Sequence, residues 1–238
     1  MLRRWKLLAS ITAVAVVLFG VGVWYFVFRD DSPPAVTLKS ATKGVERRSG
    51  NDPASLDGEW DVDSTIGSFS KFTSSFAGFR VKEELAGIGA KTAVGRTPDV
   101  TGSLTIDGSS IPETSINVDM TTLKTDEARR DDAIRHQAIE TDRFPEATFT
   151  LTEPIELDAV PKDGEAVNVD AVGDLTLHGV TKQVTFPLKA QLNGDVITVT
   201  GHLLIQFPDY DITQPRAAIV LSVENQGTIE LQLFFTKK

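Results

Sequence analysis

The chain has 238 residues, no cysteine and a formal net charge of −9 at pH 7, with 33 Asp and Glu against 24 Lys and Arg. This acidic balance argues against a nucleic-acid partner, because phosphate backbones are bound by Lys and Arg, and against flat adsorption on an anionic membrane surface. Without cysteine the chain can form no disulfide, no zinc–thiolate site and no cysteine nucleophile.

The N-terminal segment has the features of a membrane anchor. Residues 7–28 contain no charged side chain. As a helix rising about 1.5 Å per residue, this run is long enough to cross the roughly 30 Å hydrocarbon layer of a bilayer. A cleaved signal peptide would have a shorter apolar region and a small-residue cleavage site, whereas this run ends in bulky aromatic residues. We therefore predict an uncleaved transmembrane signal anchor over residues 1–28.

The charges that flank the apolar run predict its orientation. Arg3, Arg4 and Lys6 precede it, and only Arg29 follows it closely. Because basic flanks stay in the cytoplasm, we predict a single-pass cell-membrane protein with a cytoplasmic N-terminus and an extracytoplasmic C-terminal domain. Beyond residue 31 the chain carries 20 Lys and Arg against 31 Asp and Glu, so the exported part is clearly acidic.

Residues 29–56 separate the anchor from the remaining chain. They include two consecutive prolines and scattered charges, but no aromatic residue and no sustained periodicity. This composition is typical of a flexible linker, which as a coil would span roughly 30 Å. Partial docking of the linker on the domain is the alternative that the sequence leaves open.

Residues 57–238 are predicted to form one all-β domain. Between Val184 and Leu192 apolar and polar residues alternate, as in an antiparallel strand with one buried face, and the last strand alternates in the same way. His178-Gly179 and Asn193-Gly194 read as tight turns on either side. A barrel would let the last strand pair with an early one and leave no open edge. The expected strands are residues 59–63, 69–76, 100–107, 114–123, 146–153, 167–177, 180–192, 196–207 and 228–236.

One helix is predicted over residues 126–139. Acidic residues occupy its first turn and basic residues its end, which matches the helix dipole, and Pro145 prevents a longer helix. Such a helix would cover one end of a barrel. Both a structural plug and a ligand gate are compatible with this position.

Residues suited to catalysis or metal binding are scattered. His136, His178 and His202 lie in three different segments and lack the close spacing of a metal site. Asp131 and Asp132 are neighbours on the predicted helix and do not face each other, so they are expected in solvent. The sequence has no Gly-x-Ser-x-Gly turn and no glycine-rich phosphate loop. We therefore predict no enzyme activity, no cofactor and no metal site.

Three passages together resemble the YceI-like family. The passage LTLHGVTKQV at 175–184 is similar to the family's central signature, and GEWDVD at 58–63 to its opening strand. The passage RRDDAIRHQAIETDRFPEATFTL at 129–151 resembles the family's helix and the strand that follows it. The chain departs from the family pattern at 66–67, where a His-Ser pair is usual, and at 138–139, where an aromatic pair is usual.

The resemblance implies a lipocalin-like barrel, usually outside the bacterial inner membrane, whose lumen can hold a long isoprenoid or similar lipid. The predicted fold class is thus all-β, an antiparallel lipocalin-like β-barrel with one short helix, preceded by a single transmembrane helix and a linker. The predicted function is a membrane-anchored, extracytoplasmic protein that binds or carries such a lipid in the barrel lumen. The alternative is an envelope stress or interaction module with a packed barrel and no ligand.

The expected partners are a polyisoprenoid or another long apolar lipid and, through residues 7–28, the membrane; nucleic acid is not expected, and a homodimer is compatible with the sequence. His178 is a candidate for the cavity rim, and its other interpretation is a turn residue that tolerates positive φ. The candidate lumen residues are Phe144, Phe149, Leu175, Leu177, Phe186, Leu188, Leu231, Leu233 and Phe235.

Overall fold

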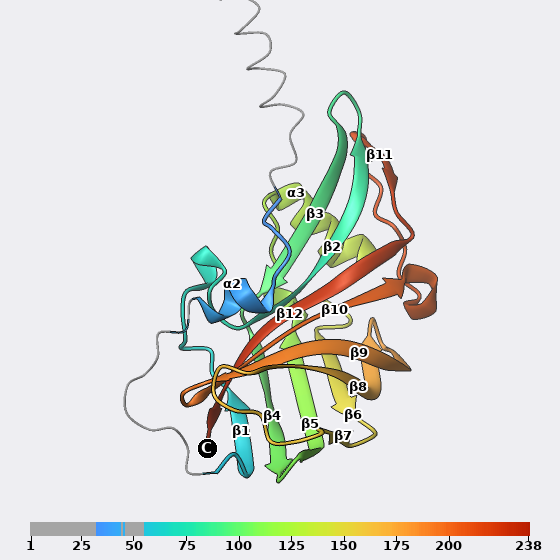
Figure 1. Ribbon diagram of the computed structural model, residues 1–238. Helices are drawn as coiled ribbons and strands as arrows, with labels where there is room; N and C mark the ends of the chain where they lie inside the picture. Colours follow the sequence, from blue (N-terminus) through green and yellow to red (C-terminus); the bar gives the residue numbers. More distant parts are fainter. Residues whose placement is uncertain (1–31, 44, 46–54) are drawn as a thin grey trace, which may run out of the picture.

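A closed antiparallel β-barrel dominates the computed structural model, which describes residues 32–43, 45 and 55–238 (Figure 1). Eight strands follow one another in the order β1-β4-β5-β6-β8-β9-β10-β12, and β12 pairs back with β1. The all-β barrel predicted from the sequence is confirmed. The ring consists of β1 (Gly58–Val62), β4 (Val100–Asp107), β5 (Ser110–Asp119), β6 (Glu146–Leu151), β8 (Ala166–Leu177), β9 (Val180–Asn193), β10 (Val196–Gln206) and β12 (Gln226–Lys237).

Three further strands extend the sheet beyond this ring. The C-terminal end of β12 pairs with β1, whereas its residues Thr228 to Gln232 pair with β2 (Phe76–Leu85). β2 in turn pairs with β3 (Gly89–Thr97) and, at its far end, with β11 (Val220–Val223). We call β2, β3 and β11 the flap, and the end of the barrel from which they rise in Figure 1 the flap end. The short strand β7 (Ile155–Glu156) pairs with the start of β5.

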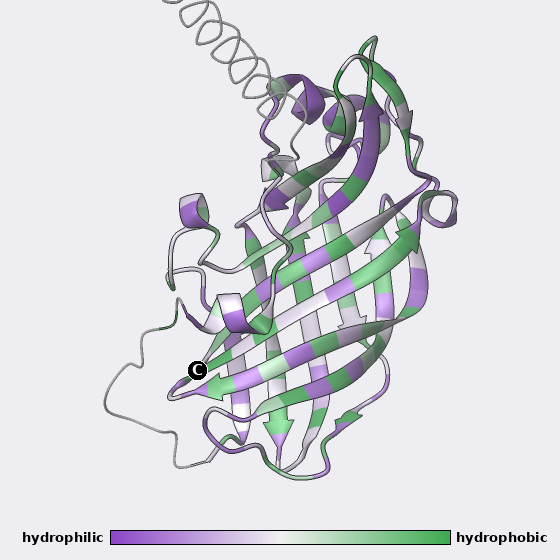
Figure 2. Ribbon diagram, turned by 45° about the horizontal axis from the view of Figure 1, so that its top comes forward, coloured by the Kyte–Doolittle hydropathy of each residue, from purple (hydrophilic) through white to green (hydrophobic). Residues whose placement is uncertain are grey.

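The hairpin of β8 and β9 follows directly from the local sequence. Along β9 Phe186 is 4% exposed, whereas its neighbours Thr185 and Pro187 face solvent. Leu177 pairs with Val180, and the two residues between them have positive φ angles of 52° and 75°, as a tight hairpin turn requires. The turn interpretation of His178 is thus confirmed. Figure 2 shows the same alternation of apolar and polar residues along the other barrel strands.

The strand predicted over residues 69–76 is wrong. Phe69–Lys71 form a short 3-10 helix, η1, which ends at Phe72 with φ at 53°, and β2 begins only at Phe76. The three phenylalanines of this passage recur every third or fourth residue rather than every second, so they do not share one face of a strand. The strands β3, β7 and β11 were not predicted, and the strand predicted over 196–207 ends one residue earlier, where η4 (Phe207–Tyr210) begins.

The helix predicted over residues 126–139 is shorter and irregular. It consists of α3 (Ala128–Ala133) and a π-helical turn, η3 (Ile134–Ala138), and only η3 has buried residues, Ile134 and Ala138. Another 3-10 turn, η2 (Met120–Thr122), follows β5. Figure 1 places α3 at the flap end of the barrel.

Part of the predicted linker is docked on the barrel rather than flexible. Residues 32–43 include the helix α2 (Leu38–Thr42), which contacts β9 and β10, and Val36 and Ala41 are buried. The docking alternative therefore applies to residues 32–43. The predicted anchor and most of the remaining linker lie outside the described residues. Within the described part of the chain, no helix is long and apolar enough to span a membrane.

β12 is buried on both faces, although the sequence pattern indicates only one apolar face. Its outward-facing residues Glu230, Gln232 and Phe234 are at most 1% exposed. The loop between β1 and β2 covers two of them, since the Gln232 side-chain amide donates to the carbonyl of Ser74 at 2.7 Å and Phe234 packs against Ile66. The third, Glu230, pairs with Arg96 of β3. The barrel wall therefore carries a second layer on this side.

Candidate functional site

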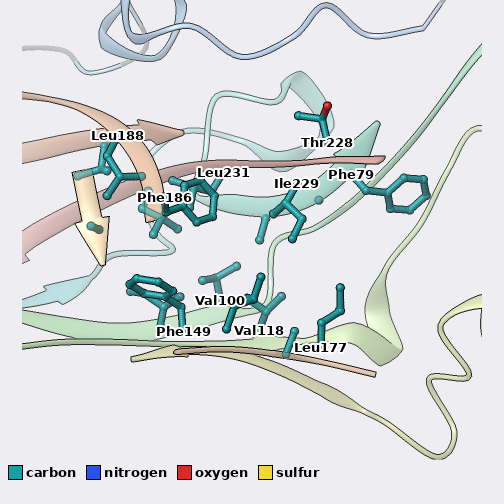
Figure 3. A pocket seen from close by; sticks show the side chains of 18 of the residues that line it. Phe79, Val100, Val118, Phe149, Leu177, Phe186, Leu188, Thr228, Ile229 and Leu231 are labelled. Atoms are coloured by element: carbon teal, nitrogen blue, oxygen red, sulfur yellow. The ribbon is translucent and has the colours of Figure 1, made fainter. Parts of the chain in front are cut away.

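The barrel encloses a cavity of about 280 Å³ (Figure 3). Its volume is close to the lower end of the roughly 300–1,000 Å³ that is typical of ligand pockets. Seven of the eight ring strands contribute lining residues, all except β1, together with the three strands of the flap. The lining is mainly apolar, because successive residues of a strand point to opposite faces and every second one faces inward. In Figure 3, Phe186 and Leu231 project from one wall toward Phe149 and Val118 on the other.

The structure brings eight of the nine predicted lumen residues together around this cavity. They come from four strands, β6, β8, β9 and β12, which lie far apart in the sequence. Whether they contact a ligand stays a prediction, but their position on the cavity wall is a feature of the fold. The eight are Phe149, Leu175, Leu177, Phe186, Leu188, Leu231, Leu233 and Phe235.

Phe144, the ninth candidate, does not line the cavity. It follows the helix in a loop before β6, and its ring centroid lies 4.4 Å from that of His178 in an edge-on contact. The ring also lies so close to Gly179 that a Cβ there would be 2.7 Å from it. Phe144 therefore packs on the β8–β9 turn, a contact that no strand periodicity predicts.

The sequence analysis missed lining residues on β4, β5 and the flap. Val100, Leu104, Ile116 and Val118 alternate along β4 and β5, two strands that were predicted, so their inward position was available from the pattern. The inward position of Phe79 and the other β2 residues could not be predicted from the pattern, because the strand was predicted over residues 69–76 instead of Phe76–Leu85.

Two aromatic rings shape the middle of the cavity. Phe149 and Phe186 meet edge to face, with ring centroids 6.2 Å apart and an interplanar angle of 84°. Gly173 leaves the room that this arrangement needs, since a Cβ there would lie 2.5 Å from the carbonyl oxygen of Thr150 and 2.6 Å from the Phe149 ring. A larger residue at this position would push the ring into the cavity.

A pair of charged side chains borders the cavity at the flap end. Glu83 of β2 and Arg130 of α3 both line it, and the Arg130 guanidinium forms an ion pair with the Glu83 carboxylate. The same guanidinium also pairs with Asp126. These ion pairs connect α3 to the flap, so the helix lies over this end of the barrel. The charged side chains of Glu83 and Arg130 form a polar edge beside the apolar interior.

His178 contacts other loops instead of lining the cavity. Its Nδ1 lies 3.0 Å from the carbonyl oxygen of Tyr210, and its Nε2 lies 3.0 Å from a carboxylate oxygen of Glu140. Hydrogen bonds from Arg143 and then from His178 hold the pKa of Glu140 below its usual value. The imidazole thus joins the β8–β9 turn, the end of η3 and η4.

A buried ion pair lies outside the barrel lumen. Arg96 donates from Nε to Glu230 at 2.7 Å, and the Arg96 guanidinium lies 4.4 and 4.5 Å from the ring centroids of Phe72 and Phe76. Arg96 is 3% exposed and Glu230 is fully buried. Among the residues described, no group of three or more His, Cys, Asp or Glu side chains could hold a metal ion.

Comparison with known families identifies the fold. The model of the YceI-like domain matches residues 60–235, nearly the whole barrel and flap. The chain belongs to the YceI-like family. The resemblance seen in the sequence is thereby confirmed, and the lining just described is the interior of a YceI-like barrel.

Relatives with a similar sequence occur in enterobacteria. A stretch of 124 residues is 36% identical to a UPF0312 protein of Enterobacter sp. (strain 638) and covers 51% of this chain and 58% of that protein. A stretch of the same length is 35% identical to Protein YceI of Shigella flexneri and covers 51% of this chain and 59% of that protein. The match therefore spans less than two thirds of these relatives.

Two solved structures share the YceI-like barrel. A polyisoprenoid binding domain from Saccharophagus degradans, implicated in plant cell wall breakdown, has a TM-score of 0.56 at 21% identity, covering 75% of this chain and 98% of that one. BcnA of Burkholderia cenocepacia has a TM-score of 0.51 at 18% identity, covering 73% of this chain and 98% of that one. At these identities the likeness concerns the fold.

Proposed function

We propose that this YceI-like protein holds a polyisoprenoid or another long apolar lipid in its barrel, and that residues 7–28 anchor it in the cell membrane with the barrel outside the cytoplasm. The observation that carries the proposal is the cavity of about 280 Å³ with its apolar walls. Each CH₂ group that leaves water for such an interior contributes about 0.8 kcal/mol, so a long hydrocarbon chain can be bound with few polar contacts.

The free volume favours a carrier over the alternative of a packed interaction module. An eight-stranded barrel has an interior just wide enough either to be filled by side chains or to hold one small ligand. Well-packed interiors contain few voids larger than a water molecule. A cavity of about 280 Å³ is therefore more than a packing defect. The related barrel from Saccharophagus degradans, described as a polyisoprenoid binding domain, supports the same class of ligand here.

The proposal includes no catalytic step. The charged residues that line the cavity are Glu83, Arg130 and Glu165, and the first two neutralise each other in an ion pair. Burial of the hydrocarbon chain supplies the binding, and the polar edge at the flap end is suited to contact a lipid head group.

The test is the lipid that copurifies with the full-length protein. The chain is purified from membranes in detergent, extracted with organic solvent and analysed by mass spectrometry, beside two variants. Leu231→Trp fills the cavity from β12, whereas Leu204→Trp adds the same bulk on β10, where Leu204 is 57% exposed. We expect a bound lipid in the parent and in Leu204→Trp, and its loss in Leu231→Trp. Equal lipid content in both variants, or none in the parent, would refute lumen binding.

A further inference from the structure

We propose that the flap end of the barrel lies against the membrane that holds the anchor, and that an exposed apolar edge of the flap enters the head-group layer. The edge is the five-residue segment from Ala217 to Leu221, which contains no charged or polar side chain. This inference rests on the proposed anchor and adds to it an orientation of the barrel.

The apolar edge is exposed to an unusual degree. Ile219 is 50% and Leu221 is 65% exposed, and Ala217 and Ala218 also face solvent. The segment belongs to or precedes β11, a short strand that pairs with the end of β2 through Val220. Apolar residues gathered on a sheet edge favour association with another surface, and soluble proteins usually protect such edges with charges.

The edge is adjacent to the flap end of the cavity. Thr213 and Pro215 just before it and Val223 just after it line the cavity. Val223 also pairs with Glu83, the residue whose carboxylate forms the ion pair with α3. A surface that covers the edge therefore also lies beside this end of the cavity.

The segment that follows the predicted anchor is fastened close to this end. Arg80 of β2 donates from Nη1 to the carbonyl of Pro33 at 2.7 Å, and Arg96 of β3 donates from Nη2 to the carbonyl of Pro34 at 3.1 Å. Both guanidinium groups are oriented by the fully buried Glu230, whose carboxylate oxygens lie 2.6 Å from Arg96 and 3.9 Å from Arg80. The two arginines thus hold this segment on the flap strands by hydrogen bonds to its backbone carbonyl groups.

The direction of this segment shows which end faces the anchor. Arg96 pairs with Gly78, which lies two positions before Arg80 in β2 and therefore farther from the flap tip. Arg80 binds Pro33 and Arg96 binds Pro34, so the segment runs away from the flap tip as it passes from Pro33 to Pro34. Ser32 is therefore the part of the segment nearest the flap. Figure 1 shows the same course, from the flap end down to α2 on the barrel wall.

The short connection between the predicted span and Ser32 places the flap close to the membrane. Only residues 29–31 lie between Phe28 and Ser32, so the end of the predicted span is at most about 14 Å away from Ser32, at roughly 3.6 Å per residue. From Arg80 to Leu85, β2 runs toward the flap tip for five residues, which is about 17 Å at roughly 3.3 Å per residue. The flap is therefore as long as the connection, and its tip reaches the membrane surface.

The charge of the exported part restricts where contact is favourable. Beyond residue 31 the chain carries 31 acidic against 20 basic residues. Anionic head groups repel such a surface, whereas an uncharged Ile and Leu edge gains by leaving water. In this orientation a lipid enters the cavity at the flap end from the adjacent leaflet, without a step through water.

The absence of cysteine makes the orientation directly measurable. Single variants Ile219→Cys, Leu221→Cys and Val160→Cys of the full-length chain are labelled with an environment-sensitive fluorophore and reconstituted into vesicles that contain spin-labelled lipids. Val160, 50% exposed in the loop between β7 and β8 at the other end of the barrel, is the control. We expect a blue shift and quenching by head-group and shallow acyl labels at 219 and 221, and neither at 160.

The outcomes separate this inference from the proposals on which it rests. Quenching that is equally weak at all three sites, in chains that still float with the vesicles, would overturn the orientation and leave the anchor intact. Failure of the parent to float with the vesicles would overturn the anchor and the orientation together, while lipid extraction tests binding independently. As a functional check, Leu221→Asp should slow uptake of a fluorescent isoprenoid from vesicles by roughly tenfold, because it removes from the membrane contact a leucine that leaves water there. Val160→Asp, at the other end of the barrel, should not slow it.

Discussion

At the scale of single residues, His178 joins segments that lie far apart in the sequence. Nδ1 faces a carbonyl oxygen of Tyr210 and Nε2 faces a carboxylate oxygen of Glu140, and both of these atoms are acceptors. The turn role of this histidine was predictable from the His-Gly pair, but its partners were not, because they lie 38 and 32 residues away in the sequence.

Glu140→Gln tests this cluster through its pH dependence. Hydrogen bonds from Arg143 and His178 lower the pKa of Glu140 below 4.5. A carboxyl group with a lowered pKa stabilises the folded state above its unfolded pKa, and this contribution is lost as the pH falls through the folded pKa. We expect the variant to melt below the parent at pH 7, and the two melting temperatures to converge as the pH falls below 4.5. A difference that stays constant from pH 7 to pH 3 would contradict this interpretation.

At the scale of elements, strand periodicity was informative wherever one strand face meets the lumen and the other meets water. β9 fulfils this condition, and so do β4 and β5 over most of their length. The pattern fails at β12, whose outer face contacts the β1–β2 loop and Arg96 of β3. It also fails at the flap, where β3 carries glycine and lysine instead of alternating apolar residues. Both failures have one cause, since contacts between segments remote in sequence decide which faces are buried.

The two faces of β9 give a matched pair of variants. Phe186→Asp would place an unpaired carboxylate on the apolar wall, which costs several kcal/mol, so we expect the domain to unfold or to lose most of its stability. Thr185→Asp changes the next residue, which faces solvent on the opposite side, and should shift the melting temperature little. Circular dichroism of the two purified proteins measures the difference. Similar melting temperatures would show that the strand is not buried on one face only.

At the scale of the whole molecule, the sequence pattern could predict a barrel but not how full it is. The same inward-facing leucines and phenylalanines line a packed core or a cavity, and the free volume depends on contacts across the barrel such as the aromatic pair of Phe149 and Phe186. The flap end of the cavity was least predictable of all, because it is lined by the flap and by Ala138 and Ile139, where the chain departs from the family pattern.

Leu188→Trp distinguishes a cavity from a packed interior in the lipid-free protein. Leu188 lines the cavity from β9, so the added indole can occupy the free space of the cavity. In a packed core the same change would cost about 1–3 kcal/mol, because neighbouring side chains would have to shift. For a domain of this size each kcal/mol lowers the melting temperature by roughly 2–4 °C. We expect a melting temperature close to that of the parent together with a strong loss of fluorescent isoprenoid binding. A variant that melts several degrees lower, from a parent that binds no isoprenoid, would mean that side chains alone fill the barrel.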